Sequence, residues 1–136
     1  MTVPQRPVPE FDDVTTPFWE AAARHELVLQ VCASCGVVRH PPRPVCPACL
    51  SWEHTWRPAG GRGTVWSWVI AHPPVLPAFA DKAPYNVAVV TLAEGVRMVG
   101  NLLDVAADEI HEGMQVEVAW EDVEDGVALP QWRPAP

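Results

Sequence analysis

The second half of this sequence has almost no positive charge. No Lys or Arg occurs from residue 98 through residue 132, and nine Asp and Glu residues lie between 104 and 125. The whole chain has a net charge of -8. Because nucleic-acid affinity depends on cationic contacts to phosphates, this distribution argues against a protein that binds nucleic acid.

Long apolar runs are also missing. The longest apolar stretch, around residues 85–93, is far shorter than the roughly 20 residues that span a bilayer. The N-terminus lacks the basic-then-apolar pattern of a signal peptide. We therefore expect a cytoplasmic protein with no membrane partner. In the reducing cytosol, four cysteines in two close pairs are expected to bind metal and not to form disulfides.

Sixteen prolines leave little room for long helices. Residues 1–26 predict an extended arm and then a short helix, with Thr16 as its N-cap, Pro17 as its first residue and His25 as its last. Alternating apolar residues before the first cysteine pair, and a second short run after it, predict a ribbon of short strands within residues 27–60.

From residue 61 onward the pattern predicts five strands. They cover residues 63–71, 85–93, 96–103, 116–121 and 127–132. Glu94-Gly95 and Asp125-Gly126 are typical hairpin turns, and a helix of one to two turns is expected over residues 105–110. Five strands with such a helix between the third and the fourth form an oligonucleotide/oligosaccharide-binding (OB) barrel. We therefore predict a mainly β protein with an OB-fold barrel at residues 61–136.

The cysteines carry the clearest chemical pattern. They are Cys32, Cys35, Cys46 and Cys49, two Cys-x2-Cys pairs with ten residues between them. Each pair can fold a knuckle that aims two thiolates at one point, and four thiolates make a closed tetrahedral site for one structural zinc ion. Iron in a rubredoxin-like site would use the same ligands, and a dithiol redox site is a further alternative. We expect zinc that stabilises the ribbon and activates no water.

Motifs for catalysis are missing. The sequence has no nucleophile elbow, phosphate loop or dinucleotide-binding glycine pattern, and its thiols are taken by the metal. The best candidate for an acid/base pair is His72 with Tyr85, on either side of a proline-rich loop. We favour the simpler interpretation that the two residues mark strand ends. The expectation is therefore a chain with no catalytic residue.

Seven tryptophans are many for 136 residues. Core packing accounts for most large aromatics, and Trp66 and Trp68 should share one face of a strand because side chains alternate. Contacts to a partner or a substrate are predicted for Trp19, His72, Phe79 and Tyr85. The acidic run at residues 117–125 is expected to form a solvated face of the barrel.

Several stretches resemble one family of proteins. They are Gln30-Val31-Cys32-Ala33-Ser34-Cys35-Gly36, Pro41-Pro42-Arg43, Cys46-Pro47-Ala48-Cys49, Gly63-Thr64-Val65-Trp66-Ser67, Pro84-Tyr85-Asn86-Val87-Ala88 and Gly113-Met114-Gln115-Val116. Over nearly its whole length the chain resembles small acyl-CoA-associated proteins in which a rubredoxin-like zinc ribbon precedes an OB fold. Within that family it is most similar to companion domains of actinobacterial aldolases that cleave steroid side chains.

This resemblance implies a function that composition and spacing do not show. It implies a non-catalytic subunit of a thiolase-fold partner, in a retro-aldolase that cleaves a steroid side-chain CoA thioester and releases propionyl-CoA. A dimeric partner would give a two-plus-two heterotetramer. The acyl-CoA would lie near the interface, and the candidate contacts to its phosphates are Arg39, Arg43, Arg57 and Arg62. Two alternatives stay open: an OB-fold binder of single-stranded nucleic acid, and a stand-alone acyl-CoA enzyme.

Overall fold

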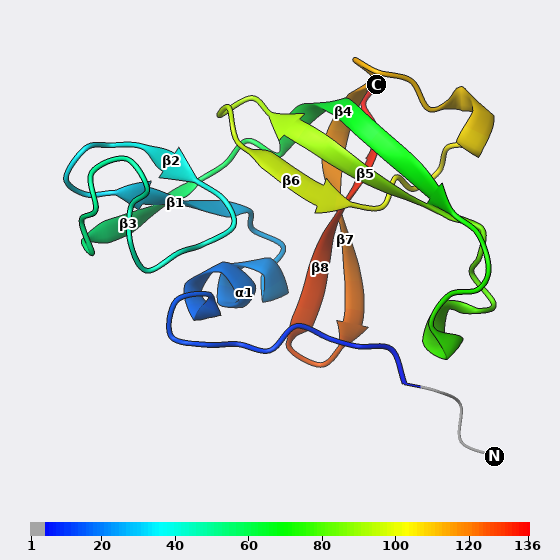
Figure 1. Cartoon of the computed structure of the whole chain (residues 1–136), viewed down its shortest axis with the longest axis horizontal. Helices are drawn as coiled ribbons and strands as arrows, with labels where there is room; N and C mark the ends of the chain where they lie inside the picture. Colours follow the sequence, from blue (N-terminus) through cyan, green and yellow to red (C-terminus); the bar gives the residue numbers. More distant parts are fainter. Residues whose placement is uncertain (1–4) are drawn as a thin grey trace.

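The computed structural model describes residues 5–136, so the first four residues of the predicted arm lie outside it. It consists of a small three-stranded sheet, one helix and a five-stranded barrel (Figure 1). The elements are α1 Thr16–Ala23, β1 Val28–Cys32, β2 Val38–Arg39, β3 His54–Pro58, β4 Arg62–Ala71, η1 Pro77–Phe79, β5 Tyr85–Leu92, β6 Arg97–Gly100, η2 Ala107–Glu109, β7 Gln115–Glu124 and β8 Val127–Pro134. The prediction of a mainly β protein is confirmed. Within residues 5–136, no helix has the length and apolar character needed to cross a membrane.

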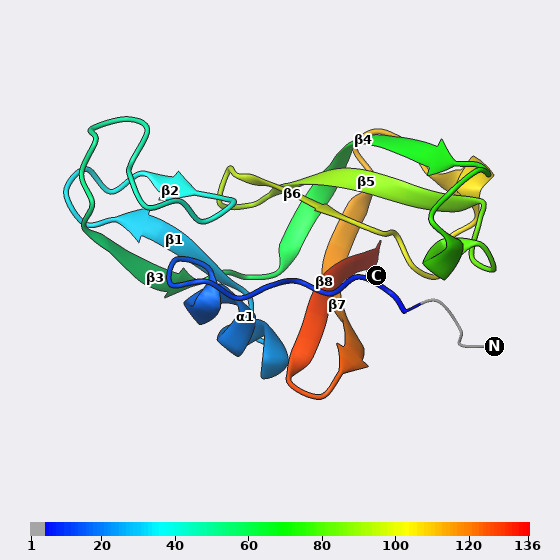
Figure 2. The ribbon, with the colours of Figure 1, turned by 60° about the horizontal axis from the view of Figure 1, so that its bottom comes forward.

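The N-terminal arm passes the hairpin of β7 and β8 and then turns into α1 (Figures 1 and 2). Asp12 makes this turn, because its Oδ1 accepts hydrogen bonds from the backbone N–H groups of Val14 and Thr15 at 2.9 and 2.7 Å. The helix begins at Thr16 itself, so the predicted cap is one residue late. It ends two residues before His25, whose φ of 60° is incompatible with a continued helix.

The ribbon is an antiparallel sheet in the order β2-β1-β3. The prediction of a ribbon is confirmed, but the strand β3 was not predicted. It pairs with the whole of β1, from Val28 opposite Pro58 to Cys32 opposite His54. In sequence, β3 has a single large apolar residue, Trp56, between polar neighbours, and so it lacks the repeated alternation that marks a strand.

The barrel sheet has the order β6-β5-β4-β7-β8, with every neighbouring pair antiparallel. A parallel bridge between Leu102 and Trp132 joins the chain after β6 to β8, which nearly closes the barrel. Gly95 and Gly126 sit in the two predicted hairpin turns with φ of 93° and 76°, a region that favours glycine. The predicted OB arrangement is confirmed.

The connection between β6 and β7 differs from the prediction. The expected helix at residues 105–110 is only a 3-10 turn over Ala107–Glu109. Ile110 follows it with extended backbone (ψ 132°) and buries its side chain in the core. So short a helix gains little from its own hydrogen bonds, and burial of Ile110 decides the conformation instead.

A β-bulge in β4 overturns the prediction for the two neighbouring tryptophans. The pairing of β4 with β5 shifts register between Val65 and Ser67. The extra residue changes the alternation of side chains. As a result Trp66 is 48% exposed, whereas Trp68 packs against the core.

One apolar core connects the barrel to the helix and the ribbon. Phe18 of α1 and Leu29 of β1 belong to the same buried cluster as Val65, Val90 and Trp132 of the barrel. Four more tryptophans pack against this cluster: Trp19, Trp56, Trp68 and Trp120. Core packing therefore accounts for five of the seven tryptophans, as expected. The shared core also places the ribbon against the barrel, while the predicted boundaries at residues 26 and 60 stay predictions.

Candidate functional site

The four cysteine sulfurs meet at the outer end of the ribbon. They lie within 4.8 Å of one another. The closest pairs are Cys32 with Cys49 at 3.5 Å and Cys35 with Cys46 at 3.6 Å. Zinc with sulfur ligands at about 2.3 Å in a tetrahedron places sulfurs about 3.8 Å apart. The geometry therefore fits one four-coordinate metal ion and leaves all four cysteines free of disulfide bonds.

Backbone N–H groups in the two knuckles prepare the sulfurs for metal. The N–H of Cys35 donates to Cys32 Sγ at 3.4 Å and lowers the pKa of Cys32 to about 6. The N–H of Cys49 likewise lowers the pKa of Cys46. The N–H of Ser51 acts to lower the pKa of Cys49, but the nearby sulfurs and burial outweigh it and raise that pKa to about 12. Thiolates packed this closely repel one another, so a dication is required to hold all four deprotonated.

A buried glutamine holds the strands next to this site. Gln30 Oε1 accepts hydrogen bonds from Arg39 Nε and from the backbone N–H of Arg43, both at 2.8 Å. Its Nε2 donates to the carbonyl of Arg43 at 2.9 Å, and so does Arg39 Nη2. Arg39 is therefore buried within the ribbon, whereas Arg43, Arg57 and Arg62 are exposed. The predicted phosphate contacts of these four residues stay predictions.

A cavity of about 500 Å³ lies between the open end of the barrel and the proline-rich loop. Phe79 and Tyr85, both predicted as contact residues, line it together, with ring centroids 6.0 Å apart. Arg6 of the arm reaches the same cavity, lies over the Phe79 ring at 5.6 Å and forms an ion pair with Glu121 at 2.6 Å. His72 follows directly after β4, is exposed and lines none of the three cavities described here.

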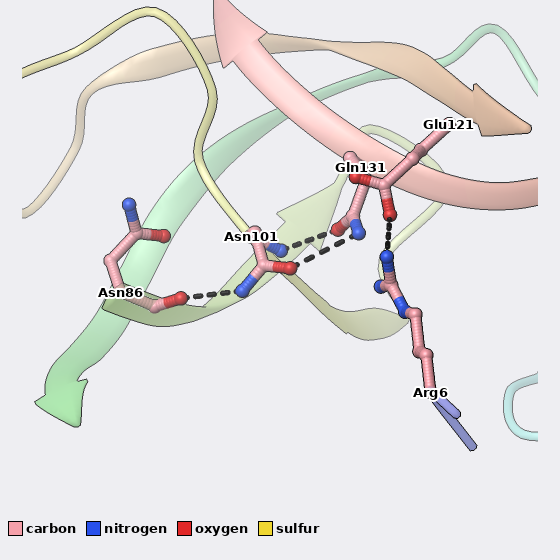
Figure 3. Close-up of polar contacts among 5 residues, drawn as sticks. All are labelled: Arg6, Asn86, Asn101, Glu121 and Gln131. Atoms are coloured by element: carbon pink, nitrogen blue, oxygen red, sulfur yellow. Dashed lines mark hydrogen bonds and ion pairs between the residues drawn. The ribbon is translucent and has the colours of Figure 1, made fainter. Parts of the chain in front are cut away.

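Three amide side chains join the end of β6 to its neighbours (Figure 3), and two of them, Asn86 and Asn101, line this cavity. Gln131 of β8 accepts a hydrogen bond from the backbone N–H of Asn101 at 2.6 Å and donates to its Oδ1 at 3.1 Å. Asn101 Nδ2 in turn donates to the carbonyl of Asn86 in β5. These hydrogen bonds hold the chain in place where the backbone pairing of β6 ends, and they satisfy the buried amide of Gln131.

A second cavity, of about 400 Å³, lies where the arm and α1 meet the ribbon and the barrel. Trp19, the remaining predicted contact residue, lines it with Phe18 and His40. The His40 ring packs on Phe18 with centroids 5.4 Å apart, and burial lowers the pKa of His40 to about 4. The imidazole is therefore neutral at pH 7, in keeping with its apolar surroundings.

The most exposed large apolar side chains were not predicted as contacts. At the tip of the ribbon, Leu50 and Trp52 are 72% and 69% exposed. On the outside of the barrel, Val69 and Val99 are 62% and 61% exposed. For Leu50 a signal existed in the sequence, because an apolar residue follows the second cysteine pair at the place where Gly36 follows the first. Both residues have positive φ, 66° for Leu50 and 78° for Gly36.

Comparison with known proteins agrees with this architecture. Residues 19–54 match the model of the rubredoxin-like zinc ribbon domain of ChsH2, and residues 56–121 match that of its C-terminal OB-fold domain. The chain belongs to the ChsH2 (DUF35) family. The match confirms the resemblance seen in the sequence, and it decides the metal: the four cysteines of this ribbon bind one structural zinc ion.

Two relatives are named as alpha subunits of CoA-thioester hydratases, and others are named as scaffold proteins. A probable enoyl-CoA hydratase alpha subunit of Thermomonospora curvata is 43% identical over 96% of this chain and 40% of its own length. The 3-oxo-4,17-pregnadiene-20-carboxyl-CoA hydratase alpha subunit of Mycobacterium tuberculosis is 37% identical over 86% of this chain and 36% of its length. The chain thus spans well under half of these two relatives. A DUF35 domain-containing scaffold protein of Methanocaldococcus jannaschii is 36% identical over 76% of this chain and 77% of its length.

Two solved structures are similar to this one. A chain of the Ltp2-ChsH2(DUF35) aldolase is 42% identical, with a TM-score of 0.86 over 94% of this chain and 99% of that chain. Homologues of this chain therefore include the companion subunit of an enzyme complex. A DUF35-family protein of Sulfolobus solfataricus has a TM-score of 0.64 but only 11% identity over 90% of this chain and 86% of its own, so it shows the fold alone.

Proposed function

We propose that this chain is the non-catalytic companion subunit of a thiolase-fold acyl-CoA enzyme, a retro-aldolase that cleaves a steroid side-chain CoA thioester and releases propionyl-CoA. The observation that carries this proposal is the similarity to a chain of the Ltp2-ChsH2(DUF35) aldolase over 94% of this chain. Relatives named for enoyl-CoA and for a pregnadiene carboxyl-CoA support the substrate class.

The chemistry of the side chains supports a companion role. All four thiols surround a single metal position, and a zinc ion with four protein ligands has no open site for water or substrate. Tyr85 lines the cavity of about 500 Å³ beside the proline-rich loop, but His72 does not. The two residues therefore do not form an acid/base pair within that cavity. The partner subunit would accordingly supply the catalytic residues.

Exposed apolar side chains support a docking role. Leu50 and Trp52 at the ribbon tip, and Trp66, Val69 and Val99 on the barrel, are each at least 48% exposed. Large aromatics such as Trp52 and Trp66 are enriched in the centres of interfaces. If the partner is a dimer with one equivalent surface on each subunit, the assembly is a two-plus-two heterotetramer.

Co-expression with the thiolase-fold protein of the same host tests the proposal. Propionyl-CoA release from the hydroxylated steroid CoA thioester is measured for the partner alone, for this chain alone and for the complex. We expect turnover by the complex only. Equal activity of the partner without this chain would remove the companion role, and turnover by this chain alone would make it a stand-alone enzyme. Salt-sensitive binding of a labelled oligonucleotide would instead favour the nucleic-acid alternative.

A scaffold is a second candidate function. The Methanocaldococcus relative named as a scaffold protein is matched over 77% of its own length, which is more than for either hydratase subunit. A scaffold would join two different enzymes without changing the turnover of either. Two measurements separate a scaffold from a companion subunit. Sedimentation shows whether this chain forms a ternary complex with two acyl-CoA enzymes of its host, and activity assays show whether the turnover of either enzyme changes. A ternary complex with unchanged turnover supports the scaffold.

A further inference from the structure

A third cavity, of about 380 Å³, lies between the zinc ribbon and the hairpin of β5 and β6. We call it the ribbon–hairpin cavity. Three of the nine basic residues of the chain line it: Arg39, Arg43 and Arg97. No Asp or Glu in the described part of the chain lines it. In a protein with a net charge of -8, this cavity therefore gathers positive charge without compensation.

Arg39 is the fixed member of this group. Arg39 is only 5% exposed. Its Nε donates to Gln30 Oε1, and its Nη2 donates to the carbonyl of Arg43. Its Nη1 is buried and has no hydrogen-bond acceptor among the described residues. A buried guanidinium with an unpaired N–H group and no carboxylate partner is costly unless an anion lies near it.

Arg43 and Arg97 are the accessible members. Both are exposed, and neither forms an ion pair within residues 5–136. The Arg97 guanidinium stacks 3.7 Å over the Trp66 ring, and its Nε makes a hydrogen bond of 3.4 Å to Thr91. Stacking occupies the flat face of the guanidinium and leaves the terminal N–H groups at its edge able to donate.

We propose that the ribbon–hairpin cavity binds a phosphate group, with Arg43 and Arg97 as contacting residues and Arg39 as a buried positive charge behind them. A phosphate monoester has about two negative charges at pH 7 and three acceptor oxygens, which suits forked guanidinium donors better than a single carboxylate does. His40, which also lines the cavity, is neutral at pH 7 and adds no charge. The proposal does not depend on the aldolase assignment, because it concerns binding by this chain alone.

Two sources of phosphate are compatible with this chemistry. One is a nucleotide headgroup, such as the phosphorylated adenosine end of coenzyme A, and the other is free inorganic phosphate. Titration of the zinc-loaded full chain, followed by amide NMR, uses adenosine 3′,5′-bisphosphate, inorganic phosphate and acetate as probes. We expect both phosphates to shift amides of residues 37–47 and 91–97, and acetate to shift none. Tighter binding of the nucleotide identifies the headgroup as the ligand, and equal binding identifies free phosphate.

Substitutions at exposed positions distinguish this site from general surface charge. Arg43→Gln and Arg97→Gln should each weaken phosphate binding about tenfold, while Arg57→Gln, an exposed ribbon arginine that lines none of the three cavities, should leave it unchanged. The amide spectra of the free variants verify that they are folded. Three results would overturn the proposal: no binding at about 10 mM phosphate, equal effects of all three substitutions, or an oligonucleotide that binds more tightly than the nucleotide.

Discussion

The ribbon and the barrel are both antiparallel sheets, but their strands bury different amounts of apolar surface. Every barrel strand contributes at least one buried apolar residue, as Val65, Val90, Met98, Val116 and Trp132 illustrate. In the ribbon, β1 buries Leu29 and Cys32, whereas β2 and β3 contribute only the partly buried Val38 and Trp56. So few buried residues cannot offset the chain entropy that the ribbon loses on folding. Zinc binding supplies the remaining free energy of folding.

Each region also contains one buried glutamine that ties a chain segment in place. Gln30 is fully buried and joins β1 to Arg39 and Arg43, and Gln131 is 3% exposed and joins β8 to Asn101. The contacts differ in kind, because Gln30 accepts from a charged guanidinium as well as from a backbone N–H, whereas Gln131 accepts from the neutral backbone N–H of Asn101. Buried hydrogen bonds thus complete both sheets, while the main stabilisation comes from the metal in the ribbon and from apolar burial in the barrel.

The largest effect is expected from loss of the metal. Chelation, or Cys46→Ser, should unfold the ribbon, since zinc binding contributes on the order of 10 kcal/mol in small zinc domains. Amide NMR should show collapse of signals from residues 27–60 while signals from β4 to β8 stay dispersed. Ser34→Ala, which lies between the two ligands of the first knuckle and is not itself a ligand, is the control and should keep zinc. A ribbon that stays folded without metal would contradict the comparison.

The next largest effect is expected in the barrel core. Trp132 is fully buried, so Trp132→Ala should lower the free energy of unfolding by about 3–5 kcal/mol. Trp52→Ala is the matched control at the 69% exposed ribbon tip, where the change should stay within about 0.5 kcal/mol. Urea unfolding of the zinc-loaded protein measures both. Equal losses would mean that the ribbon tip has a structural role that its exposure does not indicate.

The two glutamines allow a direct comparison of the polar bonds. Gln131→Leu leaves the backbone N–H of Asn101 without its acceptor and should cost about 1–2 kcal/mol. Gln30→Leu should cost more, about 2–3 kcal/mol, because it also removes the partner of a buried charge. Urea unfolding at constant zinc concentration measures the difference. A larger loss in the free energy of unfolding for Gln131→Leu than for Gln30→Leu would contradict this prediction.

An effect similar in size to those of the glutamines is a pH dependence at the junction of the two regions. Burial lowers the pKa of His40 to about 4 in the folded chain, against an ordinary value of 6.5. The unfolded chain therefore binds this proton first as the pH falls, which favours unfolding by about 2 kcal/mol between pH 7 and pH 5. His40→Phe keeps the packing on Phe18 and should lose that part of the pH dependence, as measured by urea unfolding at both pH values. An unchanged pH dependence would show that the imidazole is accessible to solvent in the folded state.

Features that depend on local chemistry were predictable from the sequence. Two Cys-x2-Cys pairs specify four sulfur ligands without reference to the rest of the chain, because a knuckle is a local turn. Glu94-Gly95 and Asp125-Gly126 specify hairpins for the same reason, since glycine tolerates the positive φ that such turns require. With the hairpins in place, the alternation of the flanking strands was enough to indicate five barrel strands in their order along the chain.

Features that depend on contacts between distant segments were decided by tertiary structure alone. The bulge that separates Trp66 from Trp68 is a mismatch between β4 and β5, which no reading of β4 alone contains. Arg39 and Arg43 are the same residue type four positions apart, yet one is buried and the other exposed, because Arg39 reaches Gln30 with its side chain and Arg43 reaches it with its backbone. Arg97 joins them at the ribbon–hairpin cavity only because the shared core presses the ribbon against β5 and β6. Local patterns therefore determined the metal site and the strands, and packing of segments far apart in the chain determined which side chains meet.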